Sequence, residues 1–371
     1  MATAPYNCFA VAAPGLESLT AAELSALGEQ PRIEEGGVAW EGDARSLMRA
    51  NLWLRTASRV LVRIARFKAT AFYELEKRAK KIPWREYVTA SRSADFRVTA
   101  HKSRLYHSDG IAQRLRDAAG SGAGEKSPES QLFVVRVVRD EFTISVDSSG
   151  ELLHMRGYRQ EVGKAPLRET LAAALLLAAG WDGQTALLDP FCGSGTIPIE
   201  GALIARHVAP GLRRAFAFSQ WPSHDVAGWT TLMAEAHERV LASSPVPIRG
   251  SDRDRGAIRA AAANAERAGV SSDVSFDARA ISSIDAADAA SGLVATNPPY
   301  GVRVGDTRAL RDLYARFGQI VRDRYTGWSV AMYSPRKDLA AQTALSLTPL
   351  FRTTNGGLRI EALHASGRFL H

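Results

Sequence analysis

The chain has 371 residues, 46% of them apolar and 23% charged, and a formal net charge of +8. These values are ordinary for folded proteins and argue against a disordered or fibrous chain. Because single domains usually hold ~100 to 200 residues, we expect two or three domains. The longest apolar run, Leu171 to Trp181, is shorter than the ~20 residues that span a bilayer. The first residues lack a signal-peptide pattern, and the two cysteines, Cys8 and Cys192, lack metal-ligand spacing. We therefore expect no membrane, no metal and a cytoplasmic location.

The N-terminal part of the chain alternates between strand and helix patterns. In residues 1–67 the patterns predict strands at 7–12, 36–40 and 59–67 and helices at 15–27 and 44–54. Residues 68–160 form a second α+β region, in which a basic helix precedes strands at 95–101, 132–138 and 141–147 and a helix at 108–118. The glycine-rich stretch 120–128 is expected to be a flexible loop.

Basic residues outnumber acidic ones between Arg55 and Arg104, and aromatic residues are interleaved among them. Such a stretch can follow phosphates and stack on bases. A solvated helix face over an ordinary core has the same composition, so this stretch alone leaves both interpretations open. If it does bind nucleic acid, Lys77, Lys80 and Lys81 are the candidate contacts.

Strands alternate with helices in the C-terminal part, residues 161–371. The patterns predict helices at 167–179, 196–205, 254–268 and 308–325 and strands at 185–188, 247–250, 274–276, 292–296 and 328–333. Such alternation predicts an α/β fold with a mostly parallel, doubly wound sheet, whose ligand site lies at the carboxyl ends of the strands. We therefore expect the catalytic site in this part of the chain.

A glycine-rich turn joins a strand to a helix at Asp189-Pro190-Phe191-Cys192-Gly193-Ser194-Gly195-Thr196. Glycines let the backbone approach a ligand closely, and the helix N-terminus offers unpaired N–H groups. The third glycine of a dinucleotide fingerprint and the Gly-Lys-Ser/Thr of a P-loop are both absent, which disfavours a dehydrogenase or an NTPase. Asp189 at the strand end suits a ligand that carries an ammonium group.

Carboxylates follow the next two strands. Asp252 ends a short strand and can accept hydrogen bonds from two ribose hydroxyls, whereas Asp254 is expected to cap the following helix. Asp277, after the next strand, is a candidate partner for an adenine amino group on position alone. Asp252 lies much further from Asp189 than in a minimal dinucleotide unit, so an insertion must intervene at about 206–244; it contains Phe216, Phe218, Trp221 and Trp229.

The most specific motif is Asn297-Pro298-Pro299-Tyr300, directly after a predicted strand. Two prolines fix the backbone and remove donors, so the carbonyl oxygens of this corner act as acceptors. The Asn297 side-chain oxygen and the Pro298 carbonyl can accept both N–H groups of an exocyclic amine, while the Tyr300 ring stacks on the base. A Pro-Pro pair alone would indicate only a rigid turn. Together with the glycine turn and Asp252 it indicates a methyltransferase that uses S-adenosyl-L-methionine.

At these residues the chain resembles the THUMP-domain N2-guanine RNA methyltransferases. The likeness includes Ala13-Pro14-Gly15-Leu16-Glu17, the segment Leu153 to Arg159, the segment Ala165 to Ala174, the three motifs above and Asn355-Gly356-Gly357. The resemblance implies a ferredoxin-like domain (1–67), a THUMP RNA-binding domain (68–160) and a Rossmann-like class I methyltransferase domain (161–371).

The resemblance also implies roles for individual residues. The target-base clamp maps onto Asn297, Pro298, Pro299 and Tyr300, and Asn297 also borders the cofactor. The cofactor residues map onto Pro166, Leu167, Arg168, Glu169, Thr170, Asp189, Pro190, Phe191, Cys192, Gly193, Gly195, Thr196, Asp252, Arg253 and Asp277.

The function favoured by these motifs is methylation of guanine N2 in rRNA (23S) or tRNA. Two alternatives remain open: an adenine-N6 methyltransferase that acts on DNA or RNA, and a non-catalytic RNA-binding or assembly protein. A carbon-5 methyltransferase would need a cysteine nucleophile near the base, whereas Cys192 lies in the cofactor turn, where a buried thiol is the simpler interpretation.

Overall fold

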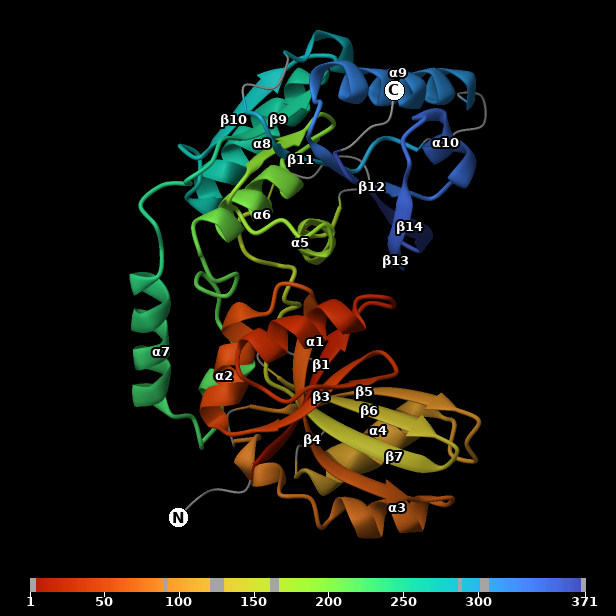
Figure 1. Cartoon of the computed structure of the whole chain (residues 1–371). Coiled ribbons are helices and arrows are strands. Elements are labelled where there is room, and N and C mark those ends of the chain that lie inside the picture. The colour runs from red at the N-terminus through yellow and green to blue at the C-terminus, as the bar shows by residue number, and fades with distance from the viewer. Residues whose placement is uncertain are drawn as a thin grey trace.

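The computed structural model describes residues 5–89, 92–120, 130–160, 167–285, 289–300 and 307–367. Two bodies stack on each other, the N-terminal one in red to yellow and the C-terminal one in green to blue (Figure 1). Each body is built on a seven-stranded sheet. Most of the predicted loop 120–128 lies outside the described residues.

The N-terminal sheet has the strand order β2-β3-β1-β4-β7-β6-β5. Alternation of buried and exposed residues produces its strands, as in β6, where Phe133, Val135 and Val137 face the core. Strand β4 pairs with β1 on one side and with β7 on the other, so one sheet runs through both predicted N-terminal regions. The elements are β1 (Tyr6–Ala12), α1 (Glu17–Ala26), β2 (Arg32–Glu34), β3 (Gly37–Gly42), α2 (Ala44–Trp53), β4 (Ala57–Lys68), α3 (Phe72–Ala79), β5 (Ala94–His101), α4 (Ser108–Ala118), β6 (Gln131–Val138) and β7 (Glu141–Asp147).

The C-terminal sheet has the order β10-β9-β8-β11-β12-β14-β13. Strands β8 to β12 are parallel, and β14 runs antiparallel to β12 and β13. The strand order reverses at β8, which is where α/β sheets bind ligands beyond their carboxyl ends. The elements are α5 (Glu169–Ala178), β8 (Ala186–Asp189), α6 (Thr196–Ala205), α7 (Val226–Glu238), β9 (Ile248–Asp252), α8 (Arg255–Ala268), β10 (Val274–Ala278), β11 (Gly292–Thr296), α9 (Thr307–Arg324), β12 (Ser329–Ser334), α10 (Lys337–Gln342), β13 (Thr348–Asn355) and β14 (Leu358–Ala365).

The insertion between α6 and β9 returns to the N-terminal body. Its helix α7 runs alongside that body and packs on α2 (Figure 1). The aromatic side chains of the insertion are buried in the N-terminal core, among them Phe216, Phe218 and Trp221. The Trp221 indole donates to Gln131 Oε1 at 2.8 Å. The insertion therefore fastens the C-terminal body to the N-terminal sheet through apolar burial.

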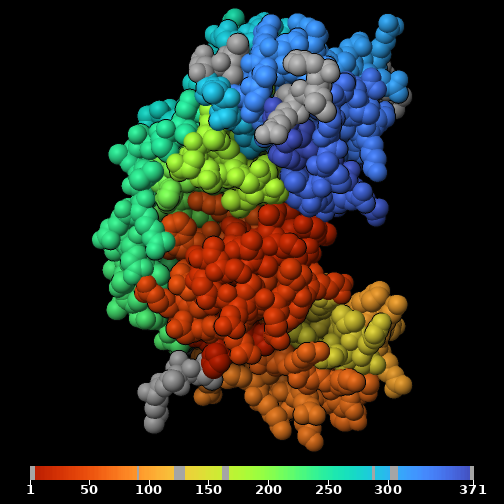
Figure 2. Space-filling view, in the orientation of Figure 1, coloured from red at the N-terminus to blue at the C-terminus, as the bar shows by residue number. Residues whose placement is uncertain are grey.

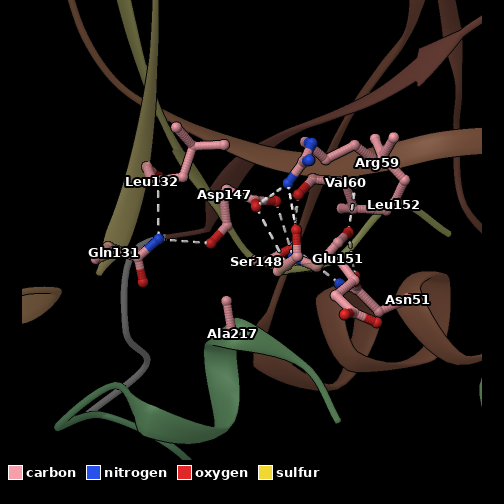
Figure 3. A network of polar contacts seen from close by, with 12 residues as sticks. Asn51, Arg59, Val60, Gln131, Leu132, Asp147, Ser148, Glu151, Leu152 and Ala217 are labelled. Atoms are coloured by element: carbon pink, nitrogen blue, oxygen red, sulfur yellow. Dashed lines mark hydrogen bonds and ion pairs between the residues drawn. The ribbon is translucent and has the colours of Figure 1, made fainter. Parts of the chain in front are cut away.

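Buried polar contacts occur at the edge of the N-terminal sheet and at the junction of the two bodies. Around the end of β7, Arg59 pairs with Asp147, and the Gln131 amide donates to the Asp147 carbonyl at 2.8 Å (Figure 3). Closer to the C-terminal sheet, Arg156 donates to Glu200 Oε1 of α6 at 2.9 Å and to the Arg55 carbonyl at 2.9 Å. Arg156 therefore links helix α6 of the C-terminal body to the Arg55 backbone of the N-terminal body.

The C-terminal hairpin also touches the N-terminal body. At Gly15, where φ is +84°, an added Cβ would lie 2.1 Å from the Arg352 carbonyl oxygen of β13. In Figure 2 the blue C-terminal region borders the red N-terminal region. Across the described ranges, every helix is either too short or too polar to cross a membrane.

Candidate active site

The carboxyl ends of β8 and β11 meet at one point of the C-terminal sheet. The two strands are neighbours, and the Thr296 hydroxyl at the end of β11 donates to Asp189 Oδ1 at the end of β8 over 2.6 Å. The Phe191 N–H donates to the same oxygen at 3.0 Å. Asn297 follows Thr296 directly, so the proline corner and the glycine turn lie on the same edge of the sheet, as the sequence analysis requires.

The glycine turn is shaped by two residues in the left-handed region. Gly193 has φ +52° and Gly195 has φ +83°. A Cβ at Gly195 would lie 2.9 Å from the Ala261 Cβ and 3.0 Å from the Phe276 ring, so glycine is needed there for packing. A Cβ at Gly193 would meet no atom within 4 Å. The turn is therefore packed on its Gly195 side and open on its Gly193 side, where a ligand can approach.

Asp252 lies against this turn. Its Oδ2 accepts from the Gly193 N–H at 3.1 Å, and its Oδ1 accepts from the Asp254 N–H at 2.9 Å. Asp254 caps α8 by accepting from the Gly256 N–H at 2.7 Å, which confirms that part of the sequence analysis. Because each carboxylate oxygen has two lone pairs, Asp252 keeps acceptor capacity for a ligand hydroxyl.

Two further predicted residues are exposed beside Asp252. Asp277 is in β10 and pairs with Ser251 of β9, one position before Asp252. Arg253 follows Asp252 at the surface. Their positions at the carboxyl edge are compatible with contact to a ligand, and their roles stay predictions.

The start of α5 supplies the remaining predicted cofactor residues. Leu167, Glu169 and Thr170 are buried and Arg168 is exposed, while Pro166 lies outside the described residues. Arg159 pairs with Glu169 over 3.0 Å, yet burial raises the pKa of Glu169 to about 7. The helix packs on β12 and α6, so its first turn lies near the same region of the sheet.

The proline corner presents an acceptor that has no donor. Asn297 Oδ1 is buried and has no hydrogen-bond partner among the described residues. Pro298 is buried, Pro299 is exposed, and the half-buried Tyr300 ring packs against the apolar cluster beneath α9. A buried acceptor that stays unpaired costs ~1–3 kcal/mol. This arrangement is explained if the site receives an N–H group from a ligand.

Burial controls the titration of the acidic and thiol groups here. Asp189 is 2% exposed, and desolvation, helped by the charge of Asp252, raises its pKa to about 7. Burial, together with the charges of Asp189 and Asp252, raises the pKa of Cys192 well above its usual range. A thiol with a raised pKa is a poor nucleophile at neutral pH, which supports a packing role for Cys192. Within the described ranges, no group of three His, Cys, Asp or Glu side chains could hold a metal ion.

Two contributors were missed by the sequence analysis. The Thr296 hydroxyl connects the two halves of the site, and Asn264 of α8 holds the glycine turn by donating to the Ser194 carbonyl at 3.0 Å. Thr296 could have been found, because it precedes the Asn297 motif at the strand end. Asn264 is a fully buried polar residue on an otherwise alanine-rich helix face, and such a residue indicates a specific partner.

Comparison with known proteins identifies the family. The profile described as "RMKL-like, methyltransferase domain" matches residues 156–360, and the profile described as "RlmL ferredoxin-like domain" matches residues 7–61. The first match alone covers more than half of the chain. The chain belongs to the RMKL-like methyltransferase family. This membership confirms the resemblance stated above and the predicted enzyme class.

Two curated relatives of this methyltransferase differ in length. "Ribosomal RNA large subunit methyltransferase K/L" of Syntrophotalea carbinolica is 39% identical over 97% of this chain, and the chain spans 53% of that protein. "Putative RNA methyltransferase slr0064" of Synechocystis is 36% identical over 96% of this chain and 95% of the relative. The chain therefore spans about half of the K/L protein and nearly all of the Synechocystis one.

Solved structures confirm the predicted fold class of this methyltransferase. The crystal structure of SMU.472, a putative methyltransferase complexed with SAH, has a TM-score of 0.90 at 27% identity, with all of both chains covered. A predicted N6-adenine-specific DNA methylase from Listeria monocytogenes has a TM-score of 0.88 at 33% identity, with 96% of both chains covered.

Proposed function

We propose that this methyltransferase moves a methyl group from S-adenosyl-L-methionine to the exocyclic N2 amine of a guanosine in RNA, with S-adenosylhomocysteine (SAH) as the leaving group and one amine proton released to water. The observation that carries the proposal is the 2.6 Å bond between Thr296 and Asp189, which sets the Asn297 corner beside the glycine turn. The relatives named as RNA methyltransferases support RNA as the substrate class. Both rRNA and tRNA fit the chemistry of the site.

The cofactor fits the residues at the carboxyl edge. S-adenosyl-L-methionine supplies an electrophilic methyl group on a sulfonium, and the SAH complex of the structural neighbour supports this choice. Asp189 offers its Oδ2 to the cofactor ammonium, because both of its hydrogen bonds given above fall on Oδ1. Asp252 accepts from the ribose hydroxyls, and Asp277 is placed to accept from the adenine amino group. The open side of Gly193 leaves room for the methionine portion.

The Asn297 corner positions the base. Asn297 Oδ1 and the Pro298 carbonyl accept the two N–H bonds of the guanine amine, which directs the nitrogen lone pair toward the methyl group. Tyr300 stacks on the base and excludes water from one face. The catalytic contribution of these residues is orientation and preorganised dipoles, and neither demands a covalent intermediate.

The N-terminal region serves RNA binding in this proposal. We divide the chain into a ferredoxin-like domain (1–67), a THUMP domain (68–160) and the methyltransferase domain (161–371).

Lys77, Lys80 and Lys81 lie exposed on and after α3. Reversing their charge is expected to weaken RNA binding and to reduce its salt dependence by ~0.7 to 0.9 per lost phosphate contact. An unchanged salt slope would remove these lysines from the RNA surface. We also propose a cytoplasmic location, where an RNA substrate would be met.

A second candidate keeps the reaction and changes the base. The Listeria neighbour is named as an adenine-N6 DNA methylase, and an Asn-Pro-Pro-Tyr corner accepts an adenine amine equally well. A duplex DNA enzyme must also extrude its target base and read the sequence around it. The RNA proposal is favoured because both curated relatives described above are named as RNA methyltransferases.

One experiment separates the candidates. Wild-type protein is incubated with labelled S-adenosyl-L-methionine and with rRNA, tRNA or DNA, and the labelled nucleoside is identified by mass after digestion. The proposal expects N2-methylguanosine from RNA. If the labelled nucleoside is N6-methyladenosine, the second candidate replaces the proposal. If the nucleic acid stays unlabelled although the cofactor binds, a binding protein is favoured. The Asn297→Ala variant serves as the inactive control.

A further inference from the structure

A basic pocket of about 400 Å³ lies between the N-terminal body and the C-terminal hairpin. Its walls come from the Pro14 loop, the end of β12 and both strands of the β13–β14 hairpin. Four basic side chains and a single carboxylate, Glu361, are part of the lining. The basic side chains are those of Arg336, Lys337, Arg352 and Arg359.

The charge of this pocket is only partly neutralised. Arg352 pairs with Glu361 at 2.8 Å, and Arg336 pairs with Asp338 at 3.0 Å. Lys337 and Arg359 are exposed, and neither forms an ion pair with a carboxylate in the part of the chain that the structure describes. Two free cations beside two fixed ones produce a local positive field that attracts an anion.

Lysine and arginine side chains are suitable donors to phosphate oxygens. Arg352, Glu361 and Arg359 lie on one face of the hairpin, because Arg352 pairs with Glu361 and Thr354 pairs with Arg359 in the strand register. The buried Thr353 pairs with Ile360 and belongs to the other face, so its hydroxyl is not part of the basic surface.

One wall of the pocket lies on the strand next to the Asn297 corner. Strand β12 is the neighbour of β11, with Thr296 opposite Met332, and the pocket wall begins two residues later at Ser334. Adjacent strands lie ~4.8 Å apart, so the Ser334 end of the pocket and the Asn297 corner are neighbours on one edge of the sheet. The close contact of Gly15 with the Arg352 carbonyl fixes the far wall, which gives Pro14-Gly15 a role in shaping the pocket.

We propose that this pocket binds a backbone phosphate of the RNA strand next to the target nucleotide, through Lys337 and Arg359. The inference rests on the proposed function, because it takes RNA as the substrate. It adds a phosphate site on the methyltransferase domain itself, separate from the lysines of α3. Its role is to hold the strand so that the target base reaches Asn297.

The test compares a Lys337→Gln/Arg359→Gln double variant with an Arg259→Gln control. Arg259 is an exposed arginine on α8, which lies at the opposite end of the sheet order. In the double variant we expect the KM for RNA to rise about tenfold or more, while kcat at saturating RNA and the Kd for SAH stay within about twofold. The salt slope of RNA binding should fall by roughly 0.7 per lost phosphate contact.

The outcomes separate the two proposals. Wild-type protein that fails to methylate RNA overturns the proposed function. Wild-type protein that methylates RNA, with a double variant that matches the Arg259→Gln control in KM and salt slope, overturns the pocket alone. Inorganic phosphate at constant ionic strength should compete with RNA for wild-type protein and not for the double variant. Phosphate that binds without displacing RNA would assign the pocket to a free ion and overturn the inference.

Discussion

Asp189 should make cofactor binding depend on pH in the neutral range. Its carboxyl is 2% exposed, and burial raises its pKa to about 7. An ammonium group of the cofactor binds the ionised carboxylate and not the neutral acid. Only the ionised fraction of the protein is then competent, and the apparent Kd rises as that fraction falls.

The magnitude follows from the pKa. With a pKa of about 7, roughly half of the protein is ionised at pH 7 and roughly a tenth at pH 6, so the Kd should rise about fivefold between them. The pH range of the binding measurement must stay below about 7.5, because an ordinary α-amino group loses its own proton at ~7.7 to 8.0. Binding near pH 7 should also release a fraction of a proton.

Titration calorimetry with SAH in buffers of different ionisation enthalpy measures both quantities. Asp189→Asn should bind SAH more weakly and with no pH dependence between 5.5 and 7. Glu169, whose pKa is also about 7, is the competing explanation. A Kd for SAH that does not change with pH in wild-type protein would refute the reasoning. A pH dependence of the Kd that persists in Asp189→Asn and disappears in Glu169→Gln would refute it too.

Three further variants test other parts of the account. Asn297→Ala should lower turnover by ~100-fold or more and leave the Kd for SAH unchanged, as expected for a lost preorganised contact; undiminished turnover would remove Asn297 from the mechanism. Gly195→Ala adds backbone strain and places the new Cβ 2.9 Å from the Ala261 Cβ, whereas Gly193→Ala adds backbone strain alone. Gly195→Ala should therefore destabilise the fold and weaken SAH binding more than Gly193→Ala does. Equal effects of the two variants in thermal unfolding would contradict this. Arg156→Met removes the arginine that pairs with the buried Glu200 and leaves the Tyr158 hydroxyl as its donor, so it should cost about 3–5 kcal/mol in urea unfolding. Replacing Glu200 by Met as well should recover part of this loss, and no recovery would show that the ion pair is not the cause.

The raised pKa of Asp189 also has a consequence for stability. Its folded-state pKa of about 7 exceeds the ordinary value, so the folded apoprotein binds the proton more tightly than the unfolded chain. The associated stability is full below about pH 4 and is lost as the pH rises through 7. Asp189→Asn should therefore lose less stability than wild-type protein between pH 5 and 8, measured as the change in the free energy of unfolding. An equal loss in both proteins would show that another group titrates.

Local elements could be predicted from the sequence because their signals are local. The helix at 108–118 and the strands at 141–147 and 292–296 have the predicted bounds, since periodicity and flanking turns fix such segments. The capping role of Asp254 was also predictable, because a helix start demands a cap. The strands of the C-terminal hairpin and helix α7 were not found.

Long-range pairing could not be read from the sequence. Nothing local to β4 or β7 indicates that they are neighbours and join two regions in one sheet. The aromatic residues of the insertion predicted that it would be buried. The sequence did not indicate whether they would pack against the N-terminal or the C-terminal body. The Arg156–Glu200 pair and the contact of Gly15 with Arg352 likewise join residues far apart in the chain, and their positions depend on the assembled fold.

The most direct test of the central claim is a crystal structure of the protein with SAH and a guanosine-containing RNA substrate. The account predicts that guanine N2 donates to Asn297 Oδ1 and to the Pro298 carbonyl, with the SAH sulfur roughly 5 Å from N2, which leaves room for one methyl group in near-attack geometry. A guanine amine that binds away from Asn297, or a sulfur that faces away from this corner, would contradict it.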